Sequence, residues 1–131
     1  MNSNNINVTI VDVIDGVEII NTTPHPINFG VGDKVVEVPT STLINATPHE
    51  EVVANENGVE LVRTVFVGND EGNAAIAKIR EAFPKAIIVG SIIAAQAYPG
   101  EVVAMTPLPG FERVAPAEKR MNPHKFTTFA V

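Results

Sequence analysis

The chain has 131 residues, 45% of them hydrophobic, a formal net charge of −6 and no cysteine. This length suits one domain that buries its own core, and the hydrophobic content excludes an intrinsically disordered chain. The acidic balance, with no basic stripe, argues against duplex nucleic acid as the main ligand. The lack of cysteine excludes disulfides, thiolate metal sites and cysteine catalysis.

Residues 1–6 carry neither the basic nor the apolar segment that a secretion signal requires. No apolar run reaches the roughly 20 residues that a membrane-spanning helix needs. We therefore expect a cytoplasmic protein without a membrane partner, organised as a single α+β domain over residues 1–131.

Apolar stretches rich in Val and Ile predict a series of short strands. Two dipeptides, Asp15-Gly16 and Asn57-Gly58, predict tight hairpin turns, because glycine accepts the positive φ that type I′ turns require. In chain order, strands are predicted at 7–14, 17–20, 27–29, 34–38, 50–54, 59–67, 86–89, 101–105, 111–114 and 125–131.

Two helices are predicted in the second half of the chain. Apolar residues recur at helical spacing over about 72–83, and Pro84 ends that amphipathic helix because its ring clashes with the preceding turn. A short apolar helix over about 91–98 connects two strands that need not be immediate neighbours. The expected fold is α+β, with these helices on a face of a mixed or mainly antiparallel sheet.

Each of the three histidines follows a proline, in Pro24-His25, Pro48-His49 and Pro123-His124. Proline fixes its own φ and favours an extended preceding residue, so each imidazole is attached to a stiff bend. Zinc accepts three imidazoles, but no two of these have the spacing of metal ligands, and no metal site is predicted. The simplest interpretation of His25 is an imidazole at a strand end, bonded to backbone or water.

Gly90-Ser91 lies at a predicted junction between a strand and a helix. Free backbone N–H groups, a hydroxyl and the helix dipole at such a junction favour a phosphate or a carboxylate. The simpler interpretation, which we prefer, is that Ser91 caps the helix and Gly90 permits the turn.

Arg63 interrupts the apolar alternation of its strand. A buried charge needs a partner, which would be Asp12 or an acidic group of a ligand held in a pocket. Exposure at an edge or a bulge is the interpretation we rank first, and the pocket second. The polar stretch 115–125 is either a mobile lid or, by preference, a surface loop.

Asn21-Thr-Thr-Pro-His-Pro-Ile-Asn-Phe29 resembles the opening of a group of small proteins common in phage and prophage genomes, roughly Asn-Leu-Thr-Pro-His-(small)-Ile. The resemblance continues at Val38-Pro-Thr-Ser-Thr42, similar to their Pro-Ser turn, and at Ala86 to Ala95, similar to their block of strand and short helix. The strand 101–105 and the region of Phe126 follow in the same order, so that most of 18–131 is covered. The resemblance implies a phage origin, in the cytoplasm of a bacterial host or in the virion, and no particular activity.

These residues favour a binding protein over an enzyme, with no catalytic group and no cofactor assigned. The leading hypothesis is that the protein sequesters or senses a small anionic, nucleotide-like ligand, held by Thr23, His25, Arg63 and Ser91. One alternative is action by protein–protein contact, as a virion accessory or assembly protein, a homo-oligomer, or an acidic inhibitor of a host enzyme. The other is a hydrolase with His25 as general base.

Overall fold

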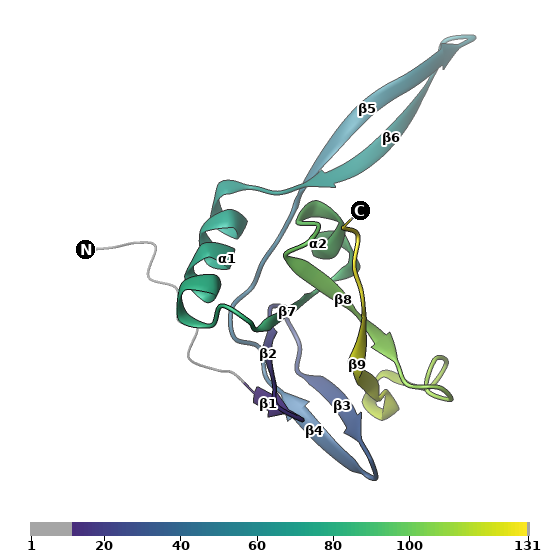
Figure 1. Cartoon of the computed structure of the whole chain (residues 1–131). Coiled ribbons are helices and arrows are strands. Elements are labelled where there is room, and N and C mark those ends of the chain that lie inside the picture. Colours follow the sequence, from purple (N-terminus) through teal and green to yellow (C-terminus); the bar gives the residue numbers. More distant parts are fainter. Residues whose placement is uncertain (1–11, 131) are drawn as a thin grey trace.

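The computed structural model describes residues 12–130 and gives a mostly-sheet α+β fold with two α-helices (Figure 1). The strands are β1 (Asp12–Ile14), β2 (Val17–Asn21), β3 (Ile27–Val31), β4 (Lys34–Val38), β5 (Thr47–Glu56), β6 (Val59–Val67), β7 (Ile87–Gly90), β8 (Val102–Pro107) and β9 (Met121–Thr127). The helices are α1 (Asp70–Ala82) and α2 (Ile92–Ala97), with a short 3₁₀ helix, η1 (Pro116–Glu118). Residues 7–11 of the first predicted strand, and the last residue of the final one, lie outside the described residues.

Seven of the strands form one sheet in the order β1-β2-β7-β8-β9-β3-β4. Three neighbouring pairs are antiparallel and three are parallel, so the sheet is mixed rather than mainly antiparallel. β7 and β8 are direct parallel neighbours, with Ile88 opposite Val102, and α2 lies in the connection between them. A bridge between Asn21 and Thr40 brings the chain just after β4 back to β2, so the sheet curls almost into a barrel.

A hydrophobic cluster lies on each face of the curled sheet, because alternate residues of a strand point to opposite sides. Ile19 belongs to the cluster inside the curl, and its neighbour Ile20 to the cluster under α1 and α2. Both side chains are fully buried, as is Phe29 at the centre of the inner cluster. Each such residue stabilises the fold by about 1.5–3 kcal/mol.

Helix α1 begins two residues earlier than its periodicity predicts, because Asn69 caps it. The Asn69 side-chain oxygen accepts a hydrogen bond from the Gly72 backbone N–H at 2.7 Å. The helix buries Ala75, Ile76 and Ile79 against the sheet and ends at Ala82, two residues before the proline.

Strands β5 and β6 form a separate two-stranded hairpin, residues 47–67, that we call the arm. Figure 1 shows it projecting away from the rest of the molecule. The predicted turn is confirmed: Asn57 and Gly58 both have positive φ, at 55° and 78°. Asp15 and Gly16 form the other predicted turn in the same way, at 51° and 82°.

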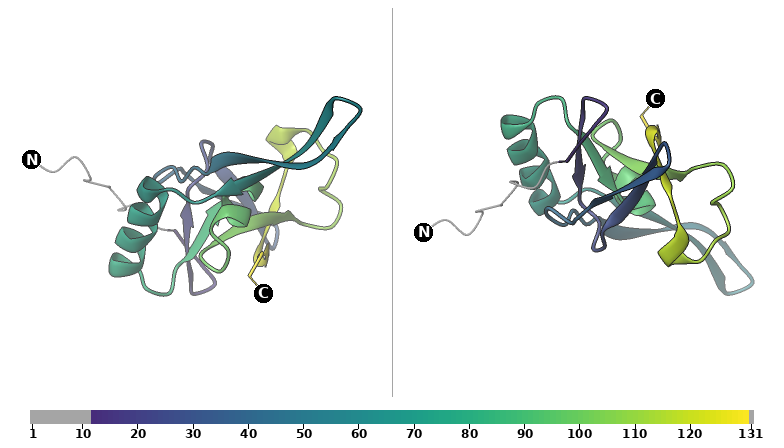
Figure 2. Two further views of the ribbon diagram at one scale, coloured as in Figure 1. Left: turned by 90° about the horizontal axis from the view of Figure 1, so that it is seen from above. Right: turned by 90° about the horizontal axis from the view of Figure 1, so that it is seen from below.

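The segment 108–120, between β8 and β9, departs from the prediction. Residues 111–114 form no strand, and β9 begins at Met121 instead of residue 125. The Leu108 N–H donates to the Arg120 carbonyl at 2.9 Å, so the segment is a loop whose ends meet and whose interior residues pair with no strand. Both views in Figure 2 place α1 and this loop on opposite sides of the molecule. Within residues 12–130 no helix is long and apolar enough to cross a membrane.

Candidate functional site

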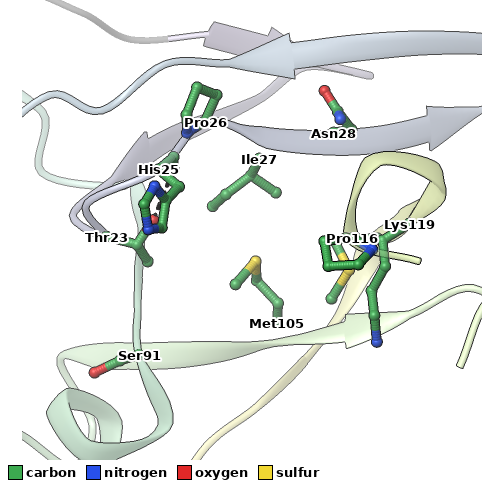
Figure 3. A pocket seen from close by; sticks show the side chains of 10 residues that line it. Thr23, His25, Pro26, Ile27, Asn28, Ser91, Met105, Pro116 and Lys119 are labelled. Carbon is green, nitrogen blue, oxygen red and sulfur yellow. Dashed lines mark hydrogen bonds between the residues drawn. The ribbon is translucent and has the colours of Figure 1, made fainter. Parts of the chain in front are cut away.

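A pocket of about 420 Å³ opens between the start of β3, β8 and the segment 108–120 (Figure 3). We call it the His25 pocket. It is lined by Thr23, His25, Pro26, Ile27, Asn28, Ser91, Met105, Pro116, Lys119 and Met121. Three of the four predicted site residues, Thr23, His25 and Ser91, therefore line one cavity although two chain segments far apart in sequence supply them.

Asn21, the last residue of β2, builds the loop that presents His25. Its amide nitrogen donates to the carbonyl oxygens of His25 at 2.8 Å and Val38 at 3.0 Å. Its side-chain oxygen accepts from the Thr23 backbone N–H at 2.8 Å and lies 2.7 Å from the Thr23 hydroxyl. Because Asn21 is only 1% exposed, these bonds replace water for every polar atom of its side chain. The loop is therefore rigid where it carries the imidazole.

Thr22 fixes this loop to the end of β7. Both its backbone N–H and its hydroxyl donate to the Val89 carbonyl, each at 2.8 Å. The next residue along β7, Gly90, has no room for a side chain, because a Cβ there would lie 2.6 Å from Val102 Cγ1 and 3.2 Å from Thr22 Oγ1. This close approach places Ser91 beside the His25 loop.

The three predicted residues play different parts in the pocket wall. Thr23 is buried, and its hydroxyl lies 2.9 Å from the His25 carbonyl oxygen, so it serves mainly to hold the loop. Ser91 caps α2, as the simpler interpretation predicts: its hydroxyl oxygen accepts from the Ala94 N–H at 3.0 Å. His25 is exposed, and its ring nitrogens bond to no other residue within 12–130. They are available to a ligand or to water.

Arg63 lies on the arm and does not line the His25 pocket. Its guanidinium binds Glu51 on the facing strand, with Nη2 3.0 Å and Nε 3.3 Å from the same carboxylate oxygen. The side chain is 65% exposed. The structure thus corrects both the ion pair with Asp12 and the grouping of Arg63 with the other three residues, and agrees with exposure at an edge. The bulge of this hairpin lies at Val53, on the other strand.

Lys119 also lines the pocket, and no interpretation of the sequence pointed to it. It lies in the segment 108–120, and no other lysine or arginine of residues 12–130 lines this pocket. Its ammonium donates to the Glu112 carbonyl oxygen at 3.1 Å, a neutral acceptor within the same loop. No sequence signal marks Lys119, because the closure of the loop rather than any local motif brings it to the pocket.

The chemistry of the pocket changes along its length. Figure 3 shows Thr23, His25 and Ser91 at one end, Pro116 and Lys119 at the other, and Ile27 and Met105 between them. The middle is therefore apolar and both ends carry polar groups. Such a cavity suits a molecule with an apolar body and at least one acidic or hydrogen-bonding group.

The three histidines belong to different elements: His25 to the loop after β2, His49 to β5 and His124 to β9. The His124 ring lies 2.8 Å from an Asp15 carboxylate oxygen at the surface. Within residues 12–130 no group of three His, Cys, Asp or Glu side chains has an arrangement that would hold a metal ion.

A second, smaller cavity of about 210 Å³ lies under the loop, between the β3–β4 turn and Leu108, Phe111 and Arg120.

Comparisons of this chain with protein-family models, with curated proteins and with solved structures found no match.

Proposed function

We propose that this protein binds a small anionic, nucleotide-like molecule in the His25 pocket and sequesters or senses it. The observation that carries the proposal is the meeting of Thr23, His25 and Ser91 with Lys119 around one cavity.

The size and walls of the pocket support this proposal. A volume of about 420 Å³ falls in the range of roughly 300–1,000 Å³ that is usual for small-molecule sites. Ile27, Met105 and Met121 offer an apolar surface for a flat ring, and thioethers adapt readily to the outline of a ligand.

The polar groups at the two ends support an anion rather than a neutral ligand. Lys119 supplies a positive charge whose present partner is only a backbone carbonyl, so a phosphate or carboxylate would be a stronger acceptor. At the other end, the His25 ring and the Ser91 hydroxyl offer hydrogen bonds from groups held by a rigid loop and a helix cap.

The position of the pocket in the sheet gives further support. β2 and β7 are parallel neighbours; the loop that carries His25 follows the carboxyl end of β2, and Ser91 directly follows that of β7. In sheets that contain parallel strands, ligands commonly bind beyond these ends.

Binding is preferred over the hydrolase alternative because a histidine general base needs a group that orients its ring. No carboxylate of residues 12–130 is hydrogen-bonded or ion-paired to the His25 ring, whereas the His124 ring is paired with the Asp15 carboxylate.

The motif that resembles the phage group builds one side of the pocket. From this resemblance we also propose that the protein acts in a phage-infected bacterial cytoplasm.

Thermal unfolding in the presence of a panel of nucleoside mono-, di- and triphosphates tests the proposal. A ligand present at 100 times its Kd stabilises the folded state by about 2.7 kcal/mol. For a chain of this size that corresponds to a rise in Tm of about 10 °C. Titration calorimetry with the best member then gives the Kd and the stoichiometry. If no member of the panel raises the Tm at millimolar concentration, the nucleotide-like ligand is rejected.

A second candidate function, action through contact with another protein, is favoured by one observation. Six large apolar side chains of the arm are exposed: Val52, Val53, Val59, Leu61, Val62 and Val67. Monomeric soluble proteins rarely expose so many together, and such surfaces usually mark interaction sites.

A further inference from the structure

The arm is an extended surface that is largely uncovered, apart from the part of β6 that contacts α2. Its two strands have 10 and 9 residues and form their own two-stranded sheet. A two-stranded hairpin is marginally stable at best when it stands alone in water. Apolar residues lie on both of its faces, since the pairs Val52–Val62 and Ala54–Leu61 occupy successive positions along the ladder. Both faces therefore gain from contact with another surface.

The arm is also strongly acidic. It carries four glutamates and one arginine, a net charge of −3. Arg63 pairs with Glu51, while Glu50, Glu56 and Glu60 form no ion pair with any residue in the described part of the chain. A partner for this surface should therefore combine apolar side chains with positive charges.

A segment that supplies the positive charges exists in the same chain. Residues 113–125, which we call the basic segment, contain four of the nine lysines and arginines and one glutamate, a net charge of +3 in a protein of −6. Lys119 and Arg120 donate only to backbone carbonyls, and Arg113 and Lys125 are exposed. Among residues 12–130 no carboxylate pairs with any of the four cations. The charges of the arm and of the basic segment are thus equal in size and opposite in sign.

A single copy does not bring these two surfaces together. The arm meets the body mainly where β6 packs on α2. In Figure 1 its tip points away from β8, β9 and the loop between them. A second copy supplies the missing surface, and a two-fold axis makes the contact reciprocal, so that both arms and both basic segments are used.

We propose that two copies of this chain form a symmetric dimer in which the arm of each packs on the basic segment of the other. Ten residues of strand make the arm about 33 Å long at about 3.3 Å per residue, and two strands with their side chains make it about 10 Å wide. Two such contacts, counted on both partners, bury about 1,300 Å², which lies within the usual range of about 1,200–2,000 Å² for a stable complex.

Charge reversal tests the dimer by sedimentation equilibrium over about 1 μM to about 1 mM protein. The wild-type chain should sediment at twice its 14.0 kDa. The arm variant, Glu56→Lys with Glu60→Lys, and the segment variant, Arg113→Glu with Lys125→Glu, should each raise the dimer Kd at least tenfold. Mixing the two variants should restore the dimer, because each arm then meets a segment of opposite charge.

The control reverses two exposed charges on α1, Lys78→Glu with Glu81→Lys, and should leave the dimer intact. Circular dichroism checks that every variant is folded. The wild-type dimer should also weaken as sodium chloride screens the contact, which gives a second measurement independent of any substitution.

A wild-type protein that stays monomeric across this range overturns the proposal. So does a dimer that is insensitive to salt and survives both reversals, since the copies would then meet elsewhere. All substituted residues lie outside the wall of the His25 pocket, so failure of the dimer leaves ligand binding to be judged separately.

Discussion

The amide nitrogen of Asn21 donates to the carbonyl oxygen of His25 at 2.8 Å and so closes the loop that carries the imidazole. The same side chain reaches Val38, which ties the loop to the end of β4. The Asn-Thr-Thr-Pro-His motif therefore has mainly a structural role. The side chains of Asn21 and Thr23 form hydrogen bonds that shape the loop, so the His25 ring is the part of the motif that can contact other molecules.

Asn21→Ala should destabilise the protein by about 2–4 kcal/mol, because it leaves several buried donors and acceptors without partners. Denaturant unfolding measures the effect. Asn122→Ala is the matched control: Asn122 accepts a single exposed bond, from the His124 N–H, so its loss should change stability by at most about 0.5 kcal/mol. Equal effects of the two substitutions would contradict the role given to Asn21.

Gly72→Ala should destabilise the protein, against the usual rule. In an exposed helix interior alanine is better than glycine by about 1 kcal/mol. In α1, however, a Cβ at Gly72 would overlap the Tyr98 hydroxyl, which accepts from the Asn69 N–H and donates to the Asn45 carbonyl, both at 2.9 Å. We expect a loss of about 1–3 kcal/mol in the free energy of unfolding.

The neighbouring substitution Asn73→Ala provides the control for Gly72, because residue 73 is exposed on the same helix. It should be neutral or slightly stabilising. If Gly72→Ala also raised the Tm, the packing of Tyr98 over the start of α1 would be refuted.

Lys119→Ala should weaken binding of an anionic ligand to the His25 pocket by about 10- to 100-fold, the effect of losing a charged hydrogen bond. Titration calorimetry with the ligand found by thermal shift gives the ratio of Kd values. Lys78→Ala, which removes an exposed lysine on α1, should leave the Kd unchanged. The effect of Lys119→Ala should shrink at high salt if charge is its origin.

Arg63→Ala should leave ligand binding unchanged. The sequence groups Arg63 with Thr23, His25 and Ser91, but its guanidinium binds Glu51 on the exposed arm. Loss of an exposed pair of this kind changes stability by about 0–1 kcal/mol. A large rise in the Kd of this variant would mean that the Arg63 side chain, of the same copy or of a partner's arm, takes part in ligand binding, contrary to the pairing of Arg63 with Glu51 described here.

What the sequence determined by itself is local. The φ preferences of Asp15-Gly16 and Asn57-Gly58 place two turns, and the helical spacing from Ala75 to Ile79, with Pro84 beyond, places α1. These features depend on residues that are neighbours in the chain, so one segment is enough to predict them. The stiff bend at Pro24-His25 belongs to the same class.

What only the tertiary structure decided is which distant segments meet. The order of the strands, the direct pairing of β7 with β8, and the placing of Ser91 beside His25 depend on contacts such as that of Thr22 with the Val89 carbonyl. Lys119 reaches the pocket because a hydrogen bond between Leu108 and Arg120 closes the loop that carries it. Arg63 forms its ion pair with Glu51 because the register of the hairpin places the two residues opposite each other. Pairing between remote residues is fixed by packing over the whole molecule, and no local pattern of residue types encodes it.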